Sequence, residues 1–80
     1  MEKAIRWRIV LDTTKSVQEF VNILTKYPET FYVVDTEGNF RVDGKSMMGM
    51  LYSTEWRSDV YLTCDTEPHG LYNELAKFII

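Results

Sequence analysis

The sequence predicts an α+β fold, an open-faced sandwich in which three helices cover one face of a four-stranded antiparallel sheet. Apolar residues alternate in some segments, as in strands, and recur every three or four positions in others, as in helices, in the order βαββαβα. The 80 residues are 45% hydrophobic and 26% charged, which is typical of one globular domain over residues 1–80. Strands with a single apolar face need a helical layer only on that face.

The first strand is expected over residues 4–11, where apolar side chains alternate with Arg6 and Arg8. This alternation places both arginines on the open face of the sheet. The first helix is expected over residues 16–26, because Ser16 has the spacing of a capping box and an apolar helical stripe follows it.

A hairpin is expected next. Residues 30–34 and 40–42 are rich in aromatic and β-branched side chains, and residues 35–39 between them have turn chemistry. Ser46 is then placed as the N-cap of a short apolar helix over residues 47–51.

The last two elements are a strand over residues 60–64 and a helix whose apolar residues recur over 71–79. Asp65, Thr66 and Pro68 have the side chains that favour the start of that helix.

Composition excludes several classes of function. The net charge is −3, and the surplus of two positive charges over residues 1–27 is too small for the basic stripe of a nucleic-acid-binding protein. The single Cys64 cannot form an intrachain disulfide, and no apolar run is long enough for a membrane span or a signal peptide. We therefore expect a soluble, cytoplasmic protein without membrane insertion, nucleic-acid partner, metal or cofactor.

One run of residues resembles a known family. In HPr, the histidine-containing phosphocarrier of the bacterial sugar phosphotransferase system, a Lys-Ser-aliphatic-Met-Gly segment opens the second helix. Its serine is the target of a regulatory kinase in Gram-positive bacteria. This sequence matches the segment nearly position for position, and its element order is similar over almost the whole chain; the matching residues are Lys45, Ser46, Met47, Met48 and Gly49. The resemblance implies an HPr-like fold and makes Ser46 a candidate phosphorylation site.

The phosphate-accepting histidine of that family has no counterpart. At its place after the first strand stand Thr13, Thr14 and Lys15. A phosphothreonine ester is too inert to pass phosphate onward, and His69 lies where the family has no catalytic group. The chain is therefore expected to be neither an enzyme nor a phosphocarrier, and it is similar to the catabolite-repression type of HPr paralogue, in which the histidine is replaced and the serine remains.

The resemblance also implies a docking surface for a partner protein. A short helix has one inward face, so Met47 and Leu51 are expected to point outward and form an adaptable apolar patch. The residues expected to bind a partner are Lys45, Met47, Met48, Leu51 and Phe20. Two alternatives stay open: Ser46 is simply an N-cap, and the apolar residues, Phe20 above all, belong to the core.

The sequence thus predicts a regulatory protein-interaction module whose partner is a regulator or an HPr-kinase-like enzyme. The alternative is a small ligand-sensing domain of the ACT or ferredoxin-like kind, which has an overlapping element order and predicts a pocket at the edges of the strands.

Overall fold

A computed structural model describes residues 3–80 of the chain. Over these residues the protein is an α+β domain with four strands and three α-helices, as the sequence predicts. The elements in chain order are β1 (Ile5–Ile9), α1 (Thr14–Leu24), β2 (Tyr32–Asp35), β3 (Arg41–Asp43), α2 (Met47–Ser53), β4 (Val60–Cys64), α3 (Leu71–Leu75) and a short 3-10 helix, η1 (Ala76–Phe78).

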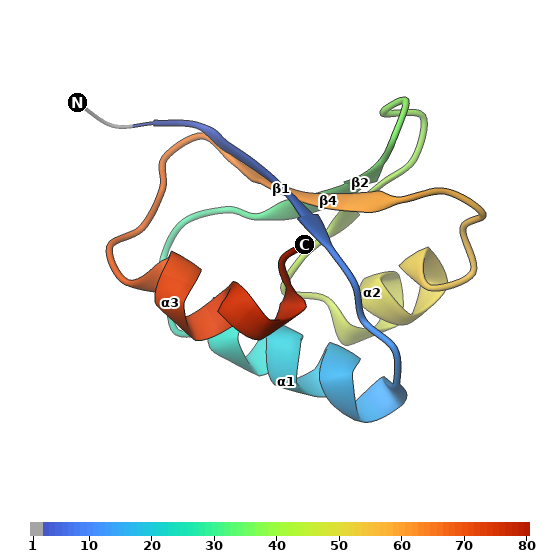
Figure 1. The fold of residues 1–80 in the computed structure, drawn as a ribbon, viewed down its shortest axis with the longest axis horizontal. Coiled ribbons are helices and arrows are strands. Elements are labelled where there is room, and N and C mark those ends of the chain that lie inside the picture. The colour runs from blue at the N-terminus through green and yellow to red at the C-terminus, as the bar shows by residue number, and fades with distance from the viewer. Residues whose placement is uncertain (1–2) are drawn as a thin grey trace.

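The four strands form one antiparallel sheet in the order β1-β4-β2-β3, so β4 lies between the two strands that come first in the chain. Figure 1 shows α1, α2 and α3 on the same side of this sheet. The C-terminal end of the chain returns to β1, where Ile79 forms an isolated bridge with Ile9 and the Ile80 N–H donates to the Arg8 carbonyl. These contacts cover part of the outer edge of β1.

Strand β1 is shorter than the predicted residues 4–11, but its alternation is as expected. Its first and last residues are buried, whereas Arg6 and Arg8 are exposed. A strand that is apolar on one face only must rest that face on another layer. The arginines therefore stay on the side of the sheet turned away from the helices.

The start of α1 differs from the prediction. Thr13, not Ser16, is the N-cap: its backbone is extended, and its hydroxyl oxygen accepts a hydrogen bond from the Ser16 N–H at 3.0 Å. Ser16 lies within the first turn, and its own hydroxyl oxygen accepts a second bond from Thr13. The helix therefore begins at Thr14, earlier than predicted, because the hydroxyl that caps it belongs to Thr13. At the other end, the helix stops at Leu24 rather than Lys26.

The hairpin between β2 and β3 is confirmed. Strand β2 begins two residues and ends one residue later than the predicted 30–34, and β3 is displaced by one residue from the predicted 40–42. The displacement reflects Asp35, which belongs to the strand and not to the turn. Its buried carboxylate accepts a hydrogen bond from the Phe40 N–H at 3.0 Å and so fixes the turn from inside. Gly38, at φ +76°, occupies the left-handed position of the turn.

Helix α2 begins where the sequence predicts. The Ser46 hydroxyl accepts a hydrogen bond from the Gly49 N–H at 3.1 Å, and the helix continues past the expected residues 47–51 to Ser53. A Cβ at Gly49 would lie only 3.2 Å from the Val42 Cβ of β3. The glycine, a poor helix former, thus permits close packing of α2 on the sheet.

The last helix begins later than expected. Asp65, Thr66 and Pro68 all precede it, and its N-cap is Gly70 at φ +83°, a conformation that side chains disfavour. The Leu71 N–H donates to the Pro68 carbonyl, so the preceding turn leads directly into α3.

The core fills the space between the sheet and the three helices. It consists of the apolar residues on the inward faces of the strands and helices. Within it, the rings of Phe20 and Phe78 pack edge to face with their centroids 5.8 Å apart. The largest fully buried side chains are Phe20, Phe31, Ile9, Leu24, Met50, Leu62, Leu71, Leu75, Val17 and Val33.

Candidate interaction surface on α2

Helix α2 turns three large apolar side chains toward solvent. Met48 is 83% exposed, Tyr52 52% and Leu51 38%. Their spacing of three and four residues puts them on one face of the helix. The opposite face carries Met50, which is fully buried, so α2 divides its apolar residues between the core and the surface.

Aromatic residues extend this face. The Trp56 ring lies 5.9 Å from that of Tyr52, edge to face, and 5.6 Å from that of Phe40 in a stacked arrangement. Phe40 comes from the turn before β3 and is 49% exposed. We call the apolar area formed by Phe40, Met48, Leu51, Tyr52 and the half-buried Trp56 the α2 surface.

Two residues expected on this surface are elsewhere. Met47 is half-buried and packs against the core, and Met48 takes the outward position that the sequence analysis gave to Met47. Phe20 has 0% exposure and is a core residue, so its side chain contributes nothing to an exposed surface. Leu51 points outward, as expected.

Lys45 is held by the fold. Its ammonium group donates a hydrogen bond of 2.5 Å to the Tyr27 carbonyl oxygen and lies 5.5 Å from the centre of the Phe31 ring. The side chain therefore reaches back toward the end of α1 instead of toward the α2 surface. It joins the segment before α2 to the turn after α1.

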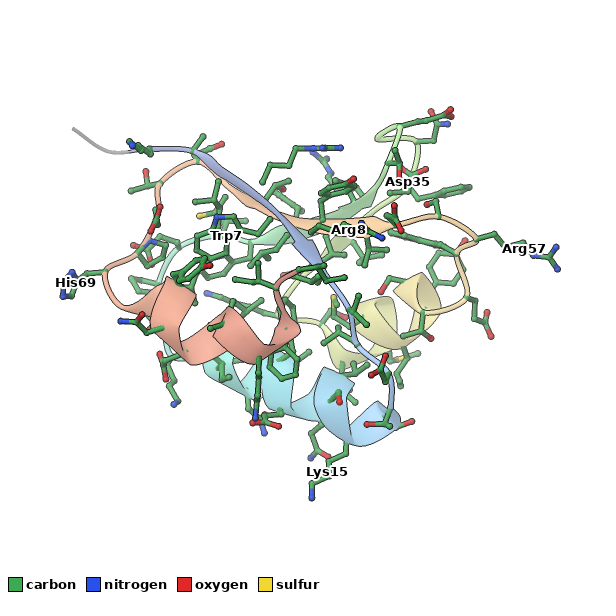
Figure 2. All side chains as sticks on the ribbon, in the orientation of Figure 1. Trp7, Arg8, Lys15, Asp35, Arg57 and His69 are labelled. Carbon is green, nitrogen blue, oxygen red and sulfur yellow. The ribbon has the colours of Figure 1, made fainter. Side chains whose placement is uncertain are left out.

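The start of α1 lies beside the α2 surface. Thr13, Thr14 and Leu51 line one small hollow of about 150 Å³, together with residues from the loop after β1 and from α1 and with the residue that follows α2. The structure thus brings Thr13 and Thr14 next to the predicted docking residue Leu51. Lys15, in contrast, is exposed and points away from the domain (Figure 2).

A second hollow, of about 280 Å³, lies at one end of the sheet. Its lining includes Arg6, Tyr32, Thr63 and Cys64, which come from β1, β2 and β4. This is the part of the sheet where a ligand-sensing domain was expected to have its pocket.

Residues with catalytic chemistry are scattered. His69 is exposed at one end of the molecule (Figure 2), and Cys64 is buried in the sheet. Within residues 3–80, no group of three or more His, Cys, Asp or Glu side chains is arranged to hold a metal ion. None of the helices in this range has both the length and the apolar character needed to cross a bilayer.

Sequence reasoning missed three members of the α2 surface: Phe40, Tyr52 and Trp56. The spacing Met48, Tyr52, Trp56 continues the helical period, and this could have indicated an outward stripe running past the end of α2. Nothing local in the sequence could place Phe40 there, because its contact with Trp56 depends on how the hairpin packs.

No protein-family model, curated protein or solved structure matches this chain.

Proposed function

We propose that this protein is an HPr-like module, with the open-faced arrangement of that family, that recognises a protein partner through the α2 surface. We further propose that it carries no phosphate on the segment Thr13, Thr14 and Lys15 at the start of α1, which we call the α1 loop. The observation that carries the proposal is the exposed apolar face of α2, which Met48 dominates with 83% of its surface open to solvent. The proposal places the protein in the bacterial cytoplasm, with a regulator or an HPr-kinase-like enzyme as its partner.

The chemistry of the α2 surface suits a protein partner. Methionine is flexible and polarisable and adapts to a second surface, whereas tyrosine and tryptophan supply large rigid contacts that often dominate binding energy. Met48, Tyr52 and Trp56 combine both properties on one face. Exposed apolar patches of this kind lower the solubility of a protein unless a partner covers them. This favours a role of the α2 surface in binding a partner protein.

The α1 loop supports the absence of phosphate transfer. The Thr13 hydroxyl both accepts from the Ser16 N–H and donates to the Ser16 hydroxyl, so it is used in capping α1. Thr14 offers only another hydroxyl, and neither side chain can form the labile phosphorus–nitrogen bond of a phosphocarrier.

Ser46 is the proposed switch. Its hydroxyl lies at the start of α2, two residues before Met48, so a phosphate there would add about two negative charges next to the α2 surface. Lys45 keeps its positive charge, but its single charge would offset only part of them, and its ammonium group is bound to the Tyr27 carbonyl. Phosphorylation would therefore change the electrostatics of the docking face while the N-cap oxygen still accepts its hydrogen bond.

Two phosphorylation assays test the switch and the lost carrier activity. Incubation with an HPr kinase and ATP should place phosphate on Ser46, located by mass spectrometry, and Ser46→Ala should remain unmodified. Incubation with Enzyme I and phosphoenolpyruvate should leave no acid-labile phosphate. Absence of phosphate from Ser46 would remove the switch, and acid-labile phosphate on any side chain would overturn the noncarrier assignment.

Docking is tested separately by titrating the protein into the HPr kinase in a calorimeter. Met48→Asp should weaken binding by about tenfold or more, because it places a charge in the centre of an apolar contact. Ile80→Asp is the matched control: Ile80 is 68% exposed and lies at the C-terminus, so its replacement should leave binding unchanged. Equal effects of the two variants, or no binding by the unmodified protein, would contradict this role of the α2 surface.

The second candidate, a ligand-sensing domain, is favoured by the hollow at the end of the sheet. If this hollow binds a small metabolite, a panel of free amino acids should raise the thermal unfolding temperature. A Thr63→Leu variant, which would partly fill the hollow, should abolish that shift.

A further inference from the structure

The face of the sheet turned away from the helices carries three of the nine Lys and Arg residues of the chain. Arg6 and Arg8 lie on β1, one edge of the sheet, and Arg41 lies on β3, the other edge. All three are exposed. Arg41 is far along the chain from Arg6 and Arg8, so only the pairing of the strands in the order β1-β4-β2-β3 gathers all three on one surface.

The guanidinium groups of Arg6 and Arg41 lean from the two edges toward the central strands. The Arg6 Cζ lies 3.9 Å from the centre of the Tyr61 ring on β4, and its Nη2 donates to the Thr36 carbonyl, just beyond β2, at 3.1 Å. The Arg41 Cζ lies 4.5 Å from the centre of the Tyr32 ring on β2. Stacking on an aromatic ring restrains a guanidinium group, so both cations are held over the middle of the sheet.

Over residues 3–80, these two cations have no acidic partner. Arg8 forms an ion pair with Asp59 at 3.0 Å, but neither Arg6 nor Arg41 makes an ion pair within residues 3–80. Asp43, the acidic residue on β3, accepts a hydrogen bond from the Lys45 N–H at the rim. Among the residues that the structure describes, no carboxylate is thus bound to either of the two restrained guanidinium groups of the open face.

The Arg8–Asp59 ion pair shows that an arginine on this face can bind a carboxylate. A guanidinium group presents several N–H donors to a carboxylate, and on this surface the Asp59 carboxylate already accepts one hydrogen bond from the Arg8 Nη2. Stacking of nucleic-acid bases on Tyr32 and Tyr61 is less favoured, because the guanidinium groups already occupy one face of each ring. The chemistry therefore favours side-chain carboxylates over bases.

We propose that the open face of the sheet binds an acidic segment of a partner protein, whose carboxylates pair with Arg6 and Arg41. This surface is distinct from the α2 surface, because Arg41 and its neighbour Phe40 turn to opposite sides of the sheet: Arg41 stacks on Tyr32, and Phe40 stacks on Trp56 beside α2. A partner could therefore occupy either surface without covering the other.

The probe is an octaglutamate peptide labelled with fluorescein, and its binding is followed by fluorescence anisotropy at low ionic strength, where charge pairing is least screened. The unmodified protein should bind it, and Arg6→Gln and Arg41→Gln should each lower the affinity about fivefold or more. Arg57→Gln is the matched control, since it removes the same charge from an exposed arginine that points away from the sheet at one end of the molecule (Figure 2). It should change the affinity less than about twofold.

Three results would overturn the proposal: no binding of octaglutamate, an equal loss in Arg57→Gln, or tighter binding of an octathymidylate oligonucleotide than of the peptide. The last result would assign the face to single-stranded nucleic acid. Thermal unfolding of each variant checks that the fold is kept. Met48→Asp, which alters the α2 surface, should bind the peptide with unchanged affinity. The proposal for the α2 surface and the proposal for the open face can therefore be contradicted independently.

Discussion

The Tyr27 hydroxyl donates a hydrogen bond to the Glu74 carboxylate, which ties the turn after α1 to α3 across 47 positions of sequence. The same carboxylate accepts a bond from the Lys26 ammonium group at 3.1 Å. These bonds hold the pKa of Glu74 below its usual range, with the Tyr27 bond as the main cause. The carboxylate in turn raises the pKa of Tyr27 from 10.0 to about 12.

The stability that comes from this contact should depend on pH in a defined window. The lowered pKa of Glu74 means that its contribution is lost as the pH falls through the acid range, and the raised pKa of Tyr27 means that its contribution is lost as the pH rises from 10 to about 12. Tyr27→Phe should therefore destabilise the protein most at neutral pH and least at either extreme. Urea unfolding of both proteins at several pH values measures this difference, and a constant difference from pH 3 to pH 12 would contradict it.

Gly44 should not tolerate a side chain. A Cβ there would lie 3.0 Å from the Leu24 Cδ1 and 3.1 Å from the Phe31 Cβ, at a buried position where α1 meets the strand layer. Gly44→Ala is expected to lower the free energy of unfolding by about 1–3 kcal/mol through overpacking. Gly38→Ala serves as a contrast, because a Cβ at Gly38 meets nothing within 4 Å and any cost comes from its positive φ alone.

Thr13→Ala should cost about 1 kcal/mol of stability, because it removes the N-cap of α1. Ser16→Ala is the informative comparison. If Ser16 were the cap, as its sequence spacing suggested, that variant would carry the larger cost. Urea unfolding of the two variants ranks them, and we expect Thr13→Ala to be the less stable protein.

The capping role of Ser46 can be separated from its proposed phosphorylation. Ser46→Ala should destabilise the protein by about 1 kcal/mol, whereas Ser46→Asp should come close to the unmodified protein, since aspartate also caps helices and its charge suits a helix N-terminus. Unfolding measured with unphosphorylated protein tests this. Equal destabilisation in both variants would mean that aspartate does not replace the serine cap, and no loss of stability in Ser46→Ala would mean that the Gly49 hydrogen bond contributes little.

Periodicity was a sound guide to the elements because each has one buried face. The alternation around Arg6 and the helical stripe through Phe20 follow from the geometry of strand and helix, and the structure has both elements. Boundaries were less certain. Thr13 and Ser16 are both good caps, and only the backbone conformation of Thr13 decides between them.

The candidate site was only partly visible in the sequence. The apolar run of α2 predicted an outward patch, but it could not show whether Met47 or Met48 faces solvent. The orientation of this short helix about its axis depends on the close packing of Gly49 against Val42 of β3, which is a tertiary contact. Phe40 was missed for a similar reason. Its exposure and its stacking on Trp56 depend on how the hairpin rests against α2.

The sequence by itself determined the α+β class, the order of the elements, the N-cap at Ser46 and the absence of a histidine at the α1 loop, since each of these depends on residue type and local spacing. Only the tertiary structure decided which side chains share a surface. The insertion of β4 between β1 and β2 brings Arg6 and Arg41 to one face, and the packing of α2 on β3 brings Phe40 to Trp56. Such contacts join residues distant in the chain, and their geometry is set by close packing of the whole core rather than by the pattern of any one segment.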